Sequence, residues 1–471
     1  MMHNPRLHLF IPPLARAFLL LLLSGSVGAQ LPTAAAVAAE MTVGWNLGNS
    51  LEVPDGETAW GNPATTKRLV DSVSRAGFNV LRIPSAWNSY ADQESLEIDA
   101  DWLARVKEVV DYGIANDMYI ILNSHWDGGW LEEQPVYTMQ AAVNEKQLAY
   151  WTQIANYFKD YGERLLFAGT NEVRANYGTP TVENIEVQES YNQTFVTAVR
   201  ATGGNNASRS LIVQTYNTNI GHGLAYFTLP EDPAEDRLFV EVHYYDPYNF
   251  TLDQDPASAC TVWGQPWADG DVCTWGQEAY TDDLFGQVNA EWVAEGVPVI
   301  LGEFGVGRRS SLTGSELTDH LESREYYLEY VVASAVENGM VPIYWDNGYY
   351  GDNGFALFNR TSGAVVDAGA LNALLDGAGG TVSTGNTPQD VDLGVALFPN
   401  PFPAALTLRI ADPALVYGLR LTDAYGRNVG YWPATAVRSS MEIGEGLPVG
   451  VYLLSVLDVR GTRSLKVVKS R

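Results

Sequence analysis

Two glutamates, Glu172 and Glu303, each stand at the end of an apolar, strand-like run. The run before the first reads LLFAGTN, and the run before the second reads VPVILG. A carboxyl group at the exit of a buried strand is held rigidly and partly away from water, which suits a general acid/base or a nucleophile. Either residue alone could be an ordinary rim glutamate that caps a helix or pairs with an arginine. Together they predict a catalytic carboxyl pair of the kind that hydrolysis of a glycosidic bond requires.

Apolar, β-rich runs alternate with amphipathic segments along most of the chain. Eight strands are expected, at residues 41–48, 78–83, 118–124, 165–171, 210–216, 237–245, 297–303 and 340–345. Helical periodicity is found at residues 63–76, 101–116, 144–161, 185–201, 277–295 and 316–338. This alternation predicts an α/β fold, a (β/α)8 TIM barrel. An open, doubly wound sheet fits less well, because no Gly-rich phosphate loop follows the first strand.

Polar and aromatic residues end nearly every expected strand. They are Asn49 and Glu52 after the first strand, Arg82 in the second, His125 and Trp126 after the third, Asn171 and Glu172 at the fourth, His243 and Tyr245 at the sixth, Glu303 at the seventh, and Trp345 and Asp346 at the eighth. The fifth strand, which ends near Tyr216, adds little. Because the carboxyl ends of barrel strands meet on one face, these residues are expected to form a single site.

In this order the strand ends resemble family 5 of the glycoside hydrolases, which are retaining (β/α)8 enzymes. The motifs that carry the resemblance are GWNLGN at 44–49, ETAWGNP at 57–63, RIP at 82–84, NE at 171–172, HYY at 243–245, GEFG at 302–305 and YWD at 344–346. The motif at 57–63 is most similar to the branch that contains endo-β-1,4-glucanases and xyloglucanases. Two positions depart from the family pattern: Trp126 follows His125 where many relatives have a second histidine, and Val173 replaces a proline.

The resemblance implies a role for each site residue. Glu172 corresponds to the acid/base and Glu303 to the nucleophile, with carboxyl groups about 5–5.5 Å apart in a retaining enzyme. Repulsion from an ionised Glu303 is expected to hold the proton on Glu172 toward neutral pH. Asn171 corresponds to the residue that hydrogen-bonds the sugar 2-hydroxyl. The other residues expected to bind substrate are Asn49, Arg82, His125, His243, Tyr245 and Trp345.

Flat aromatic side chains stack well on the apolar faces of pyranose rings, and this chain has 13 tryptophans. Trp345 is the leading candidate for a stacking platform, and the weaker candidates are Trp60, Trp87, Trp126 and Trp130. No metal is expected, because the 6 histidines form no His-x-x-x-His pattern. Paired carboxylates need no cofactor either.

We therefore predict a monomeric, retaining endo-β-1,4-glucanase that acts on a cellulose-like polysaccharide. A xyloglucanase, a mixed-linkage glucanase and, more distantly, a mannanase are alternatives, because substrate preference depends on loop shape. A non-catalytic glycan-binding barrel would require the loss of Glu172 or Glu303, and both are present. The net charge of -28 argues against nucleic acid as a partner, since phosphate binding needs a basic face.

Residues 1–29 are typical of a cleaved secretory signal, with Arg6 and Arg16 in a basic start, an apolar core around residues 18–23 and small residues at 27–29. The core is too short for a membrane anchor. The protein is therefore expected to be secreted or associated with the cell surface. Cys260 and Cys273, the only two cysteines, lie in a long loop after the sixth strand and are expected to form a disulfide, with two free thiols as the alternative.

The last part of the chain reads as a separate module. Residues 34–376 are assigned to the barrel, the Gly/Thr/Ser-rich residues 377–390 to a linker, and residues 391–471 to a β-sandwich with period-2 runs. This tail carries a charge of +3, whereas the preceding residues carry -31. It resembles the sorting domain of the type IX export system of Bacteroidetes, through FPNP at 398–401, DAYGR at 423–427, GVY at 450–452 and the basic end at 466–471. An export machinery is then its expected partner, and a carbohydrate-binding module with Tyr425, Tyr431, Trp432 and Tyr452 is the alternative.

Overall fold

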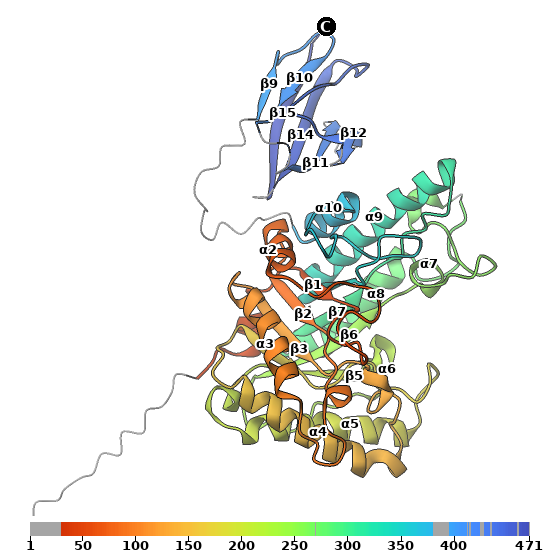
Figure 1. Ribbon diagram of the computed structural model, residues 1–471. Helices are drawn as coiled ribbons and strands as arrows, with labels where there is room; N and C mark the ends of the chain where they lie inside the picture. The colour runs from red at the N-terminus through yellow and green to blue at the C-terminus, as the bar shows by residue number, and fades with distance from the viewer. Residues whose placement is uncertain are drawn as a thin grey trace, which may run out of the picture. The chain divides into compact units, whose positions relative to one another are not determined.

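The computed structural model describes residues 30–268, 270–379, 395–411, 413, 416–423, 428–433, 436–458 and 461–470 (Figure 1). The predicted signal, residues 1–29, and most of the predicted linker lie outside these ranges. In the described part of the chain, no helix has both the length and the apolarity needed to cross a bilayer.

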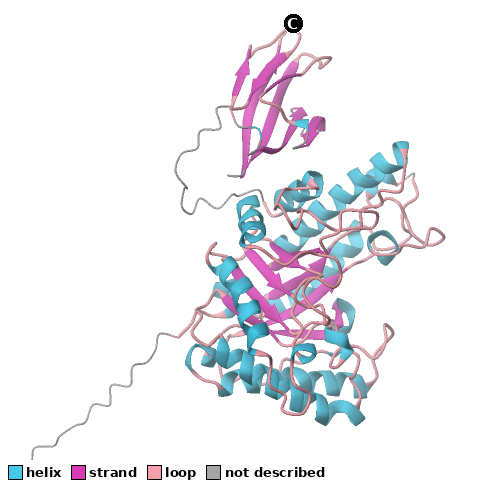
Figure 2. Cartoon of the chain, in the orientation of Figure 1, coloured by secondary structure: helices cyan, strands magenta, loops and turns pink. Residues whose placement is uncertain are grey.

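Eight parallel strands close into a barrel, with the strands at the centre and the helices around them (Figure 2). They are β1 (Gly44–Leu47), β2 (Val80–Ile83), β3 (Tyr119–Asn123), β4 (Leu165–Ala168), β5 (Leu211–Asn219), β6 (Leu238–Tyr244), β7 (Val299–Phe304) and β8 (Met340–Asp346). Strand β1 pairs with β8, with Gly44 opposite Ile343. The predicted TIM barrel is thereby confirmed, and the open doubly wound sheet is wrong.

The helices are α1 (Ala34–Ala38), α2 (Lys67–Ala76), α3 (Ala100–Ile114), α4 (Tyr137–Tyr157), α5 (Val182–Ala201), α6 (Ile220–Tyr226), α7 (Tyr248–Thr251), α8 (Glu278–Val288), α9 (Gly314–Glu337) and α10 (Ala368–Gly377). The six expected helical segments correspond to α2, α3, α4, α5, α8 and α9, whereas α1, α6, α7 and α10 were not predicted. Short turns add η1 (Asn88–Tyr90), η2 (Asp127–Gly129), η3 (Gly204–Ala207), η4 (Gln265–Trp267) and the π-type η5 (Asn289–Val293). Helix α2 shows how the local sequence sets the ends of a helix. The Thr66 side chain accepts a hydrogen bond from Leu69 N at the N-terminus, and Gly77, in the left-handed conformation, ends the helix.

The two-residue repeat of the strands sorts side chains into layers. Residues that face the helices join the main core, which includes Leu81, Val240 and Leu301. A second apolar cluster holds Val80 and Phe239, with α1 residues at its edge. Two residues further along β2 and β6 the same strand face carries Arg82 and Glu241, both fully buried. A charged layer therefore lies above an apolar one, at the carboxyl ends of the strands.

The tail forms two antiparallel sheets, as expected for a small all-β module. One has the order β13-β10-β9, and the other has the order β12-β11-β14-β15. The strands are β9 (Ala396–Phe398), β10 (Leu406–Arg409), β11 (Val416–Asp423), β12 (Asn428–Pro433), β13 (Ser440–Ile443), β14 (Gly450–Asp458) and β15 (Gly461–Lys469). Residues from both sheets, such as Leu408 and Leu454, form a core of their own.

Candidate active site

The carboxyl ends of β4 and β7 bring Glu172 and Glu303 together. Glu303 lies within β7, and Glu172 follows the end of β4. One carboxylate oxygen of each residue lies within 4.8 Å of the other. The Glu303 side chain is buried, whereas 26% of the Glu172 side chain is exposed. The predicted pair is therefore assembled, with one member open to a ligand from solvent.

Arg82 is the cation at the centre of the site. Its Nη1 donates to Glu303 Oε1 at 3.0 Å and to Asn46 Oδ1 at 2.9 Å. Its Nη2 donates to Asn171 Oδ1 at 2.8 Å and lies 2.9 Å from Glu241 Oε1. Because Arg82 is fully buried, it fixes the positions of these groups and balances part of their negative charge.

Tyr245 completes the surroundings of Glu303. Its hydroxyl donates to Glu303 Oε2 at 3.1 Å. Burial and the nearby charges of Glu303 and Glu172 raise the pKa of Tyr245 well above its usual value, so the phenol stays a hydrogen-bond donor. Burial raises the pKa of Glu303 as well, and the charges of His243 and Arg82 only partly oppose this.

His243 lies among three carboxylates. Its Nδ1 is 2.8 Å from Glu172 Oε1 and 3.7 Å from Glu303 Oε2, and its Nε2 is 3.3 Å from Glu241 Oε1. Burial lowers the pKa of His243, but the charge of Glu303 and the hydrogen bonds to Glu172 and Glu241 outweigh burial and raise it to about 9. At neutral pH the imidazole is therefore protonated.

This cation corrects the expectation for Glu172. Burial raises the pKa of Glu172, but the hydrogen bond and charge of His243, together with the charges of Arg174 and Arg82, lower it overall. Repulsion from Glu303, on which the expectation rested, acts in the opposite direction and is outweighed. In the free protein the proton lies on His243, next to the acid that would use it.

Glu241 is a site residue that the sequence analysis missed. Its side chain is fully buried on β6, and its Oε2 accepts from Gln214 Nε2 at 2.6 Å. Burial raises its pKa, but Arg82, His243 and Gln214 lower it to about 2. The available signal was a charged residue inside an otherwise apolar strand, two positions before His243 and on the same face.

Glu132 and Arg174 were also missed. They lie in the loops that follow β3 and β4, and their side chains form an ion pair of 2.6 Å. Glu132 Oε2 accepts from Asn171 Nδ2 at 3.2 Å. No periodicity marks either residue, because both lie outside regular secondary structure.

The remaining predicted residues lie around this centre. The rings of His125 and Trp345 stack, with centroids 5.7 Å apart and an interplanar angle of 9°. Asn49 lies just beyond β1, and its contacts among the described residues are backbone hydrogen bonds, with Glu52 and with Asn62 Nδ2 at 2.9 Å. The structure therefore places Trp345 and His125 side by side but gives Asn49 no contact with the two glutamates.

The weaker tryptophan candidates divide into two groups. Trp87 is fully buried and donates through Nε1 to the Asn123 carbonyl at 2.8 Å, so it is a packing residue. Trp130 packs edge-on against Tyr150. Trp60 is 46% exposed and lies 6.0 Å from the Trp126 ring, centroid to centroid. Trp60 is the most exposed of these four candidates, and Trp126 and Trp130 are partly buried.

The long loop after β6 contains the predicted disulfide. Cys260 and Cys273 are bonded, which confirms the pairing and excludes two free thiols. Trp263, in the same loop, is fully buried and donates to the Gly276 carbonyl at 2.6 Å, whereas Trp275 is 41% exposed. The disulfide joins two parts of this loop, and the buried indole packs against Tyr326, Tyr327 and Tyr330 of α9.

Glu172, His243 and Glu303 are also the one set of possible metal ligands among the residues that the structure describes. Both nitrogens of His243 already face carboxylates, and the Arg82 guanidinium lies 3.0 Å from Glu303. A divalent cation would be repelled by Arg82 and by the protonated imidazole. The arrangement fits acid/base and nucleophile chemistry better than metal binding.

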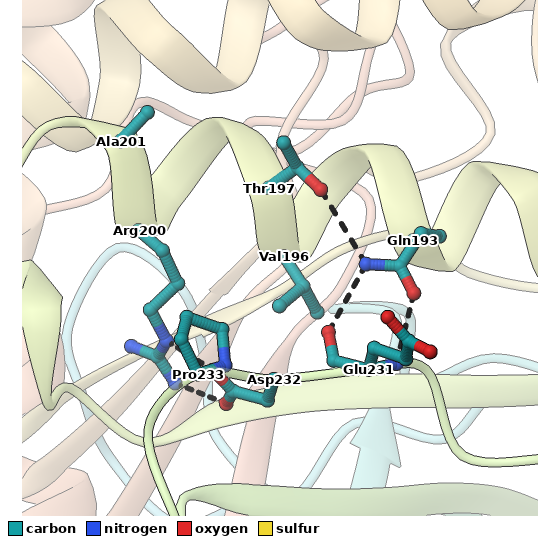
Figure 3. A pocket seen from close by; sticks show the side chains of 8 residues that line it. All are labelled: Gln193, Val196, Thr197, Arg200, Ala201, Glu231, Asp232 and Pro233. Carbon is teal, nitrogen blue, oxygen red and sulfur yellow. Dashed lines mark hydrogen bonds and ion pairs between the residues drawn. The ribbon is translucent and has the colours of Figure 1, made fainter.

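A separate surface pocket lies between α5 and the loop that precedes β6 (Figure 3). Its polar groups are paired with one another: Arg200 with Asp232 at 2.7 Å, and Gln193 with the backbone of Glu231. It shares no residue with the glutamate site. Because it adjoins the C-terminal end of α5, it lies toward the end of the barrel opposite the strand exits.

Comparison with known proteins gives consistent matches over about three quarters of the chain. Residues 46–351 match the family model described as cellulase (glycosyl hydrolase family 5). The chain is 43% identical over 358 residues to a xyloglucan-specific endo-beta-1,4-glucanase of Bacteroides ovatus. This alignment covers 73% of this chain and 70% of the relative. It is 37% identical over 368 residues to endoglucanase A of Paenibacillus barcinonensis, covering 73% of this chain and 90% of the relative.

Solved structures agree with these sequence matches. The fold is similar to that of the Bacteroides ovatus GH5 xyloglucanase in complex with a XXXG heptasaccharide, with a TM-score of 0.71, 42% identity, and coverage of 75% of this chain and 78% of the other. A GH5-4 broad specificity endoglucanase from Clostridium cellulovorans gives a TM-score of 0.66 at 35% identity, with coverage of 74% and 97%.

Proposed function

Because the chain belongs to glycosyl hydrolase family 5 and is an endo-β-1,4-glucanase, we propose that Glu303 is its nucleophile and Glu172 its acid/base. The observation that carries this assignment is the separation of the two carboxylates, with oxygens within 4.8 Å of each other. Such a short separation is typical of retaining enzymes, since an inverting pair needs about 6.5–9.5 Å to hold a water molecule.

In the first step, Glu303 attacks the anomeric carbon while the glycosidic oxygen takes a proton from Glu172. Arg82 and Tyr245 hold the Glu303 oxygens in place for the attack. The proton that Glu172 donates comes from His243 across their 2.8 Å hydrogen bond, which leaves the imidazole neutral. The products of this step are a glycosyl ester of Glu303 and a free hydroxyl on the leaving sugar.

In the second step, Glu172 accepts a proton from water, and the resulting nucleophile attacks the anomeric carbon of the ester. The bond to Glu303 breaks, and its carboxylate returns with its electron pair. Two displacements at the same carbon restore the β configuration. The first product released from a β-glucan is therefore the β-anomer.

Stereochemistry tests this assignment directly. A fresh digest of a soluble β-1,4-glucan, followed by proton NMR before mutarotation, should show the β-anomer first. An initial α-anomer would overturn the nucleophile assignment. Glu303→Gln, which removes the negative charge with little change in shape, should give no anomer signal at all while keeping the circular dichroism spectrum of the unaltered protein.

The preferred glucan is proposed to be a neutral β-1,4-glucan backbone, with xyloglucan as a second candidate. Support for xyloglucan comes from the Bacteroides ovatus enzyme at 43% identity, whose name and solved structure both specify that polysaccharide. Relatives at 35–37% identity are named as endoglucanases without that restriction. Reducing-end release from carboxymethylcellulose, xyloglucan, lichenan and mannan, measured side by side, distinguishes the two candidates and the mannanase and mixed-linkage alternatives.

We also propose that the protein is exported, and that residues 391–471 act as its sorting domain. The signal-like N-terminus and the tail motifs support this proposal, as does the all-β build of the tail with Lys466 and Lys469 on its last strand. Deletion of residues 391–471 should block delivery to the cell surface in the native host and leave the purified barrel active as a monomer. A tail that bound cellulose, with export unchanged by the deletion, would instead show a carbohydrate-binding module.

A further inference from the structure

Glu132 contacts the residues on both sides of Glu172. Its Oε2 accepts from Asn171 Nδ2 at 3.2 Å, and its Oε1 accepts from Arg174 Nη1 at 2.6 Å. The backbone N–H of Arg174 donates to the Glu132 carbonyl at 2.7 Å. Arg174 Nη1 also donates to the backbone carbonyl of Glu172 at 2.8 Å. One buried carboxylate, 4% exposed, thus connects the loop after β3 with the segment that carries the acid/base.

An apolar cluster underlies these polar contacts. Leu131 and Val173, the sequence neighbours of Glu132 and Arg174, are buried together with Val143, Val187 and Tyr191. Val173 is the residue that stands where many relatives have proline. Here its side chain packs the two loops against α4 and α5, so Glu132 and Arg174 are presented from a rigid base.

Asn171 has one amide orientation that satisfies both neighbours. Its Oδ1 accepts from Arg82 Nη2 at 2.8 Å, and its Nδ2 donates to Glu132. A flipped amide would place its NH2 group against the guanidinium and its oxygen against the carboxylate, and both contacts would be repulsive. Glu132 occupies one of the two N–H donors. The second N–H remains available for a sugar hydroxyl.

We propose that Glu132 is a positioning residue, which fixes the Asn171 amide toward the sugar 2-hydroxyl and holds Arg174 beside Glu172. This inference rests on the proposed function, since the sugar contact is assigned to Asn171 by family resemblance. Glu132 itself touches no reacting atom in this scheme. Its effect on the reaction is transmitted through Asn171 and Arg174.

The pKa of Glu132 depends on the residues that it contacts. Burial and the charge of Glu172 raise the pKa of Glu132 to about 7, and the hydrogen bonds from Arg174 and Asn171 oppose the rise. The ionised carboxylate therefore depends on the same two residues that it orients. Groups that depend on one another in this way show non-additive effects when they are substituted together.

The test uses Glu132→Gln with a dinitrophenyl β-cellobioside and its analogue that lacks the 2-hydroxyl on the sugar bearing the aryl group. The aryl leaving group needs no acid, so the measurement isolates the contact through Asn171. With the hydroxyl present, kcat/KM should fall about 10- to 100-fold, which is the usual worth of a hydrogen bond to a charged group. With the deoxy analogue, the fall should be less than about 3-fold.

Two further variants keep the result interpretable. Glu145→Gln removes one glutamate charge from the exposed side of α4 and should leave both rates unchanged. In an Asn171→Ala background, Glu132→Gln should cause no further loss on the hydroxyl-bearing substrate. An equal loss on both substrates, no loss on either, or full additivity with Asn171→Ala would overturn the positioning role. If the unaltered protein cleaved neither the aryl cellobioside nor any β-glucan, the proposed function would itself fall, and the positioning role with it.

Discussion

Replacing Arg82 with methionine removes the central cation and leaves its partners in place. The Arg82 side chain is fully buried and lies 2.9 Å from Glu241 and 3.0 Å from Glu303. Methionine fills much of the same space but cannot donate a hydrogen bond. Glu241 and Glu303 would then share the single positive charge of His243 with Glu172. We expect the protein to lose both stability and activity.

The size of the stability loss follows from two separate arguments. Breaking a buried ion pair by removing one partner costs about 3–5 kcal/mol. Burial raises the pKa of Glu241, but Arg82, His243 and Gln214 together lower it from 4.5 to about 2. At 1.36 kcal/mol per unit the whole shift amounts to about 3 kcal/mol, to which Arg82 makes the largest favourable contribution. Because this pKa is lowered in the folded state, the stabilisation is present above pH 4.5 and is lost as the pH falls toward 2. The cost of Arg82→Met should therefore be full at pH 7 and shrink in acid.

Urea unfolding at pH 7, followed by tryptophan fluorescence, measures this cost. All the tryptophans except Trp432 precede residue 380, so the signal reports on the barrel. Arg82→Met combined with Glu241→Gln removes the orphaned charge and should recover at least half of the lost free energy of unfolding. Activity should stay lost in the double variant, because Glu303 still lacks its arginine.

Arg75→Met, at an exposed position on α2, is the matched control and should change the free energy of unfolding by less than about 0.5 kcal/mol. The reasoning would be refuted if Arg82→Met lay within about 1 kcal/mol of the unaltered protein, since breaking this pair is expected to cost several times more. A double variant less stable than Arg82→Met alone would refute it equally.

Three other outcomes are expected. Glu172→Ala should lose most of its activity on polysaccharide yet keep the first step on a dinitrophenyl cellobioside, whose leaving group needs no acid; an equal loss on both in single-turnover kinetics would indicate another acid. Because the pKa of His243 is raised from 6.5 to about 9, its stabilisation is complete below pH 6.5 and is lost as the pH rises through 9. Between these values the free energy of unfolding should fall more steeply than in His243→Asn, by up to about 1.4 kcal/mol per pH unit; identical slopes in urea titrations would contradict the assignment of the proton to His243. Replacing Cys260 and Cys273 together with serine should lower stability by no more than about 3 kcal/mol and make the loop after β6 easier to cleave with protease, whereas unchanged cleavage would show that packing around Trp263 alone holds the loop.

Much of the architecture was predictable because it depends on short-range pattern. The two-residue repeat of strands and the alternation with helices identified all eight barrel strands within a few residues of their observed ends. The same topology explains why Glu172 and Glu303, far apart in the chain, meet at one face. Helix α4 was predicted to begin at residue 144 but begins at Tyr137, since amphipathic periodicity is weak in its first turns.

Which groups share charge and protons depends on how the folded chain packs. His243 is protonated because Glu241, Glu172 and Glu303 converge on it, and this depends on strand register and side-chain depth. Glu132 reaches Asn171 through loops that have no repeating pattern. Trp87 likewise proved to be buried packing and not a sugar platform. Residue type and spacing determine which strand end carries a group, whereas its pKa and its partners depend on distances of a few ångströms between segments remote in the sequence.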